Sequence, residues 1–78
     1  MGFSFKQRAN RKYVSSKIIH FIEYDDDARQ LKVGFNDGLV GLFDEVPENI
    51  ITEFENAKSK GNFFYSKLFN AGYKYYVD

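Results

Sequence analysis

Cysteine is absent from the 78 residues, so neither a disulfide nor a thiolate metal site stabilises the chain. A chain of this length forms one small domain that buries only about 60% of its unfolded surface. Tryptophan is also absent and proline occurs once, whereas nine phenylalanines and six tyrosines are present. Because aromatic side chains bury large areas, we expect them to supply most of the core.

Long apolar runs are also missing from the chain. None approaches the roughly 20 apolar residues that a membrane-spanning helix needs. The N-terminus is basic but has no long apolar stretch after it, unlike a signal peptide. We therefore expect a soluble, cytoplasmic protein with no membrane partner.

Residues with catalytic or metal-binding chemistry are few. His20 is the only histidine and lies inside an apolar, strand-like segment. With no cysteine and no second histidine, the chain contains no recognisable nucleophile–base pair or zinc ligand set. The triplet Asp25-Asp26-Asp27 lacks the spaced ligands and central glycine of a calcium loop. We predict a non-enzymatic protein without a cofactor or a metal site.

The net charge is zero, but the charges are segregated along the sequence. Residues 1–22 contain five basic residues and no acid. Residues 23–56 contain ten acids and two basic residues, and residues 57–78 are basic again. If the fold gathers the two ends, one basic and one acidic face result, and a basic face binds polyanions. The alternative is that the ends contact the acidic middle and the charges cancel.

The first 14 residues show no sustained period and are expected to form a basic, irregular arm, followed by one domain over residues 15–78. Strands are predicted over residues 17–24, 30–36 and 39–44, because these segments are rich in β-branched and aromatic residues or alternate in polarity. Residues 73–77 are either a fourth strand or an extended tail.

Turn and helix signals separate these segments. Asp37-Gly38 is typical of a tight type I′ hairpin turn. Pro47 suits the start of a helix over residues 47–59, and Gly61 suits its end in the left-handed conformation. A second short helix is predicted over residues 62–69. The fold class is therefore α+β: a three- to four-stranded antiparallel sheet with two helices packed on it.

The order of these signals resembles the KTSC domain, a family named for its place at the C-terminus of some lysyl-tRNA synthetases. The similarity extends over about residues 15–76. It rests on an ordered set of motifs: Tyr24-Asp25, Leu31-x-Val33-x-Phe35-x-x-Gly38, Val46-Pro47, and Ala57-x-Ser59-x-Gly61-x-x-Phe64 followed by Leu68. The family also occurs as a small stand-alone protein, so the resemblance implies one of bacterial or phage type. Its function is unestablished, and RNA binding is suggested by the synthetase context. The matching family-motif positions are Gly41, Phe43, Val46, Pro47, Ser59, Gly61 and Phe64.

One departure from the family concerns function. Family members have a Tyr-x-Tyr pair shortly before Val-Pro, and here those positions are Gly41 and Phe43. If that pair binds RNA in the family, this chain has lost or altered the binding.

The C-terminal third interleaves lysines with aromatics, the side chains with which proteins hold single-stranded nucleic acid. In a domain this small, many of these aromatics are needed in the core. Our first hypothesis is binding of RNA or single-stranded nucleic acid, and the alternative is a protein–protein adaptor or regulator. The candidate binding residues are Lys12, Lys58, Lys60, Lys67, Lys74, Tyr73 and Tyr75.

Overall fold

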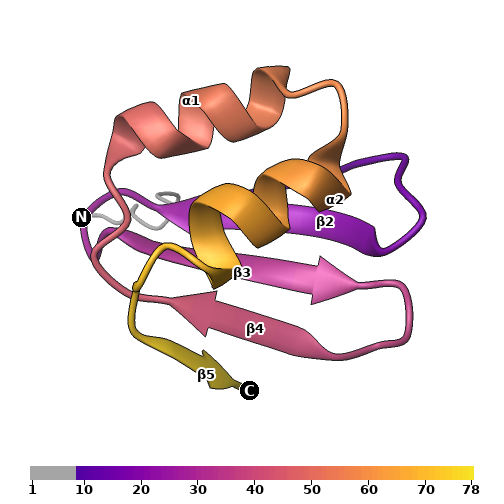
Figure 1. The fold of residues 1–78 in the computed structure, drawn as a ribbon. Coiled ribbons are helices and arrows are strands. Elements are labelled where there is room, and N and C mark those ends of the chain that lie inside the picture. Colours follow the sequence, from indigo (N-terminus) through magenta and orange to yellow (C-terminus); the bar gives the residue numbers. More distant parts are fainter. Residues whose placement is uncertain (1–8) are drawn as a thin grey trace.

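A computed structural model describes residues 9–78 of the chain. It contains one antiparallel sheet with the strand order β1-β2-β3-β4-β5, and two helical segments that follow β4 and cover one face of the sheet (Figure 1). This confirms the predicted α+β class, with five strands in place of three or four. The strands are β1 (Ala9–Tyr13), β2 (Ile19–Asp25), β3 (Gln30–Phe35), β4 (Val40–Phe43) and β5 (Tyr75–Val77).

Strand β1 corrects the expected irregular arm over residues 1–14. Residues 9–13 pair antiparallel with β2, while residues 1–8 lie outside the described part of the chain. Its side chains point alternately to the two faces of the sheet. Lys12 extends toward α1 (Glu48–Asn56), while Arg11 and Tyr13 pack on the opposite face. A strand in which both faces present polar or amphipathic side chains lacks the apolar alternation that identifies strands in a sequence.

Strand β2 contains a bulge between Ile19 and Phe21. Simple alternation predicts His20 and Ile22 on one face with Ile19 on the other. In the structure the pairing shifts by one residue, so Ile19 and Ile22 both lie in the core, whereas His20 is exposed. A bulge of this kind places two residues opposite one on the neighbouring strand.

Phe21 covers a glycine on the sheet face away from the helices. Its ring lies over Gly34, the residue opposite it on β3, so closely that a Cβ at Gly34 would overlap the ring. The Arg11 guanidinium lies 3.9 Å from the centre of the same ring, and its Nε donates to Glu23 at 2.8 Å. Phe21 is therefore buried although it lies on the uncovered face.

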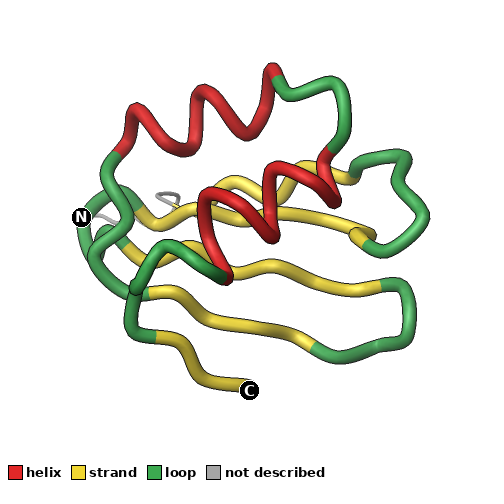
Figure 2. The backbone as a smooth tube through the Cα atoms, in the orientation of Figure 1, coloured by secondary structure: helices red, strands yellow, loops and turns green. Residues whose placement is uncertain are grey.

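The two helical segments begin near the predicted positions, but the break between them lies at different residues from those predicted (Figure 2). α1 ends at Asn56, three residues early, because Ala57 takes an extended conformation. The next helical segment begins at Lys60 and comprises α2 (Lys60–Phe63) and a π-helical continuation, η2 (Phe64–Phe69). Within the described residues, no helix is long and apolar enough to cross a membrane.

Gly61 has a different role from the predicted helix end. It lies inside α2 and is not among the glycines with positive φ. A Cβ at this position would lie 3.0 Å from Ile18 Cδ1. The glycine therefore permits close approach between α2 and the loop before β2.

The core lies between the helices and one face of the sheet. Its residues come from every strand except the two edge strands and from each helical segment. The side chains with no exposed surface are Ile19, Leu31, Val33, Phe43, Val46, Phe54 and Leu68.

The hairpin between β3 and β4 confirms the Asp-Gly turn but corrects its type. Gly38 has φ +97°, whereas Asp37 is not among the residues with positive φ. Gly38 N–H donates to Phe35 O, and Phe35 N–H donates to Leu39 O. This pattern fits a type I turn followed by a left-handed glycine, since a type I′ turn needs positive φ at both central residues.

The predicted C-terminal strand is present as β5. The Asp44 carboxylate accepts hydrogen bonds from the Tyr76 hydroxyl at 2.6 Å and from the Gln30 amide at 3.0 Å. These bonds hold the pKa of Asp44 below its usual value, and the bond from Tyr76 has the larger effect. The same bond from Tyr76 raises the pKa of the tyrosine. The Tyr76–Asp44 hydrogen bond therefore links β5 to the residue that follows β4.

Replacement of Asp44 by asparagine is expected to lower stability at neutral pH but not in acid. Because the folded pKa is depressed, the stabilisation is complete above the unfolded value of about 3.9 and is lost as pH falls through the folded pKa. Urea denaturation at several pH values measures this. The wild-type and Asp44→Asn stabilities should begin to approach each other below about pH 4 and meet once the pH lies below the folded pKa. Parallel curves into strong acid would count against the interaction.

Candidate nucleic-acid interface

Two loops meet at one end of the sheet, on the right in Figure 1. The first, residues 14–18, joins β1 to β2, and the second, residues 57–59, joins α1 to α2. Ser16 Oγ shapes the first loop by accepting from the N–H groups of Ile18 and Ile19, both at 3.3 Å. Ser59 Oγ caps α2 by accepting from Asn62 N–H at 3.3 Å. Ile18 of the first loop packs against Gly61 at the start of α2, just after the second loop.

A continuous depression follows these loops. One part, of about 450 Å³, lies between the end of β1 and the end of α1, and the next, of about 390 Å³, lies between the two loops. The parts share Ser15, Lys58 and Lys60, so they form one surface feature. We call it the basic groove, and it is lined by Lys12, Tyr13, Lys17, Lys58, Lys60 and Tyr65.

The four lysines differ in how they are held. Lys12 forms an ion pair with Glu55 at 2.8 Å. Lys60 Nζ donates to the carbonyl oxygens of Ala57 at 2.7 Å and Glu55 at 3.3 Å, which close the end of α1. Lys17 and Lys58 are exposed and form no ion pair within the described residues. The last two lysines are therefore available to an anionic ligand.

The opposite end of the sheet is acidic. The turn after β2 holds Asp25, Asp26 and Asp27, and the connection from β4 to α1 holds Asp44 and Glu45. Both segments lie at the left in Figure 1, and Val46 N–H donates to Arg29 O between them. Much of the charge segregation along the sequence thus becomes a segregation between the two ends of the strands. Two residues depart from it: Lys74 lies beside Asp44 at the acidic end, and Asp37 lies near Lys17 at the basic end.

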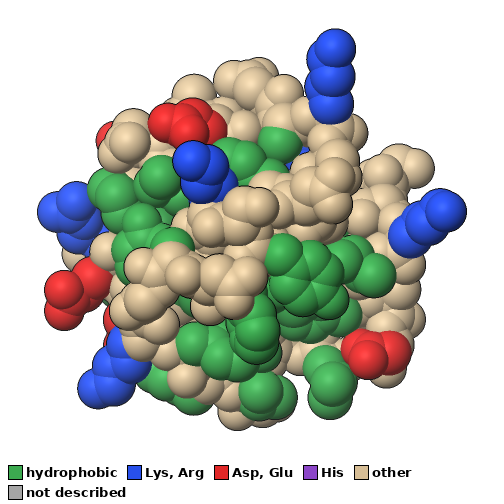
Figure 3. All heavy atoms as spheres, viewed as in Figure 1, with side chains coloured by type: hydrophobic (Ala, Val, Ile, Leu, Met, Phe, Trp, Pro, Cys, Tyr) green, Lys and Arg blue, Asp and Glu red, His purple; other side chains and the backbone are tan. Residues whose placement is uncertain are grey.

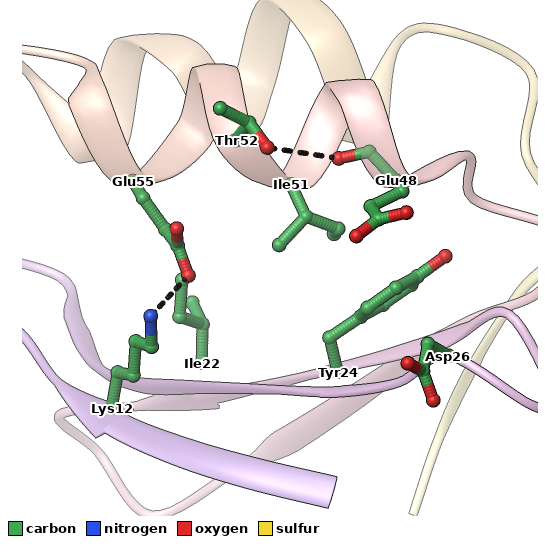
Figure 4. A pocket seen from close by; sticks show the side chains of 8 residues that line it. All are labelled: Lys12, Ile22, Tyr24, Asp26, Glu48, Ile51, Thr52 and Glu55. Carbon is green, nitrogen blue, oxygen red and sulfur yellow. Dashed lines mark hydrogen bonds and ion pairs between the residues drawn. The ribbon is translucent and has the colours of Figure 1, made fainter. Parts of the chain in front are cut away.

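A smaller cavity of about 230 Å³ lies between α1 and the strands beneath it. Its side chains include Asp26 and Glu48 at the acidic end and the Lys12–Glu55 ion pair at the other (Figure 4). Tyr24 projects along this cavity, and its hydroxyl donates to Val46 O at 2.6 Å. The Lys12–Glu55 pair therefore separates the acidic cavity from the basic groove.

Only three of the five predicted binding lysines line the groove. Lys67 and Lys74 are exposed elsewhere, on η2 and before β5. Tyr73 is half-buried and packs against the core. Tyr75 is 36% exposed, but its ring lies 4.6 Å from that of Phe43 in the aromatic cluster near β5.

The motif positions are mainly structural. Phe43, Val46 and Phe64 are buried in the core, and Pro47 is the N-cap of α1. Gly41 lies beneath Tyr75, whose Cε1 would come within 2.7 Å of a Cβ there. The tyrosine of β5 thus occupies the space that a side chain at position 41 would fill. Neither Gly41 nor Phe43 lines the basic groove.

Three groove residues were missed from the sequence. Lys17 was placed at the start of a predicted strand, and Tyr13 in the irregular arm. Tyr65 is 49% exposed, whereas Phe64 beside it is buried. The sequence alone does not show which of these two neighbouring aromatic residues faces the core. The sequence offers no clear signal for β1, because Arg11, Lys12 and Tyr13 do not alternate in polarity.

The other polar residues offer little chemistry. His20 is exposed, contacts the rings of Tyr13 and Phe21, and lies outside the groove. Ligand oxygens of Asp25, Asp26 and Asp27 lie within 4.8 Å of one another. However, Asp25 Oδ1 already accepts from the N–H groups of Asp27 and Ala28, which is the bonding of a turn.

Comparison with known proteins gives consistent results. The model of the KTSC domain family matches residues 15–75. A crystal structure of a KTSC domain protein from Yersinia pestis is similar at 32% sequence identity with a TM-score of 0.81, and the match covers 90% of this chain and 97% of that chain. No curated protein matches the sequence.

Proposed function

The chain belongs to the KTSC domain family, and we propose that it is a non-enzymatic cytoplasmic protein that binds single-stranded RNA along the basic groove. The observation that supports this most strongly is that four lysines and two tyrosines line one continuous groove. They come from segments separated by about 40 residues or more, from β1 to η2.

The electrostatics of the groove favour a polyanion. Glu55 neutralises Lys12, and no other carboxylate lines the two parts of the groove. Lys17, Lys58 and Lys60 keep their positive charge on opposite sides of it. Each phosphate that a lysine neutralises releases counterions, which strengthens binding at low salt.

The tyrosines favour a single strand. Tyr65 is 49% exposed at one end of the groove. Tyr13 borders the other end and is 65% exposed, although its ring packs against His20 and Phe21 outside the groove. Unstacked bases bind to such aromatic faces, whereas the stacked bases of a duplex are inaccessible to them. The substitution of Gly41 and Phe43 for the family's tyrosines lies outside the groove and does not weaken this proposal.

The salt dependence of RNA binding tests the proposal. Fluorescence anisotropy with a labelled single-stranded RNA of mixed sequence gives the dissociation constant at each salt concentration. If the three lysines that keep their charge neutralise three phosphates, log K should fall with log salt with a slope of about −2. A duplex RNA of the same length should bind more weakly. Absence of binding at low salt, or a slope near zero, would contradict the proposal.

A protein-interaction role is favoured by a different surface. Tyr75 and Val77 of β5 and the neighbouring Phe69 are exposed, on a side where hydrophobic side chains gather in Figure 3. Because β5 and β1 are the two edges of the sheet, this surface and the β1 end of the groove are separate.

A further inference from the structure

The backbone of β5 offers a free edge. Lys74 O accepts from Asp44 N–H, and Asp78 N–H donates to Val40 O, so residues 74 and 78 direct their hydrogen bonds toward β4. Because the direction alternates along an antiparallel strand, Tyr75 and Val77 direct their N–H and C=O groups outward. Within the described residues, no strand pairs with this side of β5.

The side chains beside this edge are apolar. Val77 is 57% exposed, and the Tyr75 ring lies 5.7 Å from that of Phe69, which is 50% exposed. Phe69 in turn contacts Tyr65 with ring centres 6.0 Å apart. The exposed edge and the row of exposed aromatics therefore lie together.

We propose that β5 pairs antiparallel with β5 of a second copy of this chain, centred on Tyr76, to join two sheets into one. In this register Tyr75 lies opposite Val77 of the second copy. Both residues direct their backbone groups outward, so the two pairs related by symmetry form four inter-chain hydrogen bonds. Such a self-complementary contact closes as a two-fold dimer.

The charges at the ends of β5 fit this register. Centring the pair on Tyr76 places Lys74 opposite Asp78 of the second copy, twice in the dimer. Both side chains are exposed. Although Lys74 lies near Asp44, that carboxylate is already bonded to Tyr76 and Gln30. Opposite charges directly across an antiparallel pair are stabilising, and like charges are destabilising.

The interface is small, because β5 has three residues. We therefore expect weak association with a dissociation constant on the order of 100 µM. The β1 edges and the loops of residues 14–18 lie away from this contact, so a dimer presents two basic grooves.

Charge exchange across the contact tests the register. Sedimentation equilibrium over a series of protein concentrations measures the dimer constant for the wild type, Lys74→Asp, Asp78→Lys and the double exchange. Each single variant places like charges opposite each other twice and should weaken the dimer about tenfold. The double exchange restores opposite charges and should recover the wild-type constant.

A backbone variant separates pairing from charge. Val77→Pro removes a donor that is unused within the monomer, so it should abolish the dimer while circular dichroism stays unchanged. Val77→Thr keeps the donor and should retain dimerisation. A wild type that stays monomeric at the highest concentrations, or a dimer that the single charge variants and Val77→Pro leave unaltered, would overturn the proposal.

Discussion

Charge reversal at Lys17 and Lys58 should weaken binding of single-stranded RNA by about a hundredfold. Each neutralised phosphate contributes on the order of fivefold near 0.1 M salt, and a glutamate adds repulsion to that loss. Both lysines are exposed, lie on opposite loops of the groove and form no ion pair within the described residues. The Lys17→Glu/Lys58→Glu variant should therefore keep its fold, and anisotropy with labelled RNA gives its affinity.

The matched control is Lys67→Glu/Lys74→Glu, which changes the net charge equally at two lysines outside the groove. Because Lys74 also belongs to the proposed β5 contact, both variants are compared at protein concentrations well below the dimer constant. Its loss should be severalfold at most, because a distant charge acts through a screened field. The slope of log K against log salt should fall in magnitude for the groove variant and stay nearly constant for the control. Equal losses in the two variants would mean that net charge, and not the groove, determines binding.

Replacement of Gly34 by alanine should destabilise the domain by about 2 kcal/mol, which lowers the melting temperature by roughly 10 °C in a domain of this size. The new methyl group overlaps the Phe21 ring, which is buried over Gly34 under the Arg11 guanidinium. The ring must leave this position and expose its apolar surface. The entropic gain from replacing glycine, about 0.4–1 kcal/mol, is too small to compensate.

A double-mutant cycle identifies the ring as the cause. With Phe21→Ala already present, Gly34→Ala should be neutral or slightly stabilising, because the methyl group then fills open space. Phe21→Leu provides a second background if the alanine variant is too unstable to measure. An equal loss from Gly34→Ala in the presence and absence of Phe21 would show that backbone conformation, and not the ring, requires glycine.

Local signals predicted much of the fold. The alternation of Leu31, Val33 and Phe35 correctly gave a strand with its inner face toward the core. Ile51 and Phe54 correctly gave the buried face of α1. These features depend on residues close together in the sequence, where the period of side-chain burial determines the element.

Features that depend on contacts between distant segments could not be predicted. The bulge in β2 moves Ile19 and Ile22 to the same face, and only pairing with β3 reveals it. Gly61 suits a helix end by its sequence, but its contact with Ile18 gives it a different role. β1 was missed because its side chains are polar on both faces.

The candidate site likewise combines residues that the sequence predicted with residues that only the fold brings together. Lys12, Lys58 and Lys60 were predicted as binding residues and lie in one groove. Lys67 and Lys74 also stand among aromatic residues in the sequence, but they lie outside the groove. Tyr65 and Lys17 become neighbours of the other lysines only through the packing of α2 against the loop of residues 14–18. Composition therefore indicates the kind of ligand that we propose, and the fold determines which lysines line the groove.

The most direct test is an NMR titration of the ¹⁵N-labelled wild-type protein with a short single-stranded RNA at low salt. The basic groove predicts that the largest amide shifts occur in residues 14–18 and 57–62, with smaller changes at Lys12 and Tyr65. Amides of the acidic turn at Asp25–Asp27 and of β5 should change little. A spectrum that RNA leaves unaltered, or shifts concentrated on β5 or on the sheet face that holds Phe21, would contradict the proposed function.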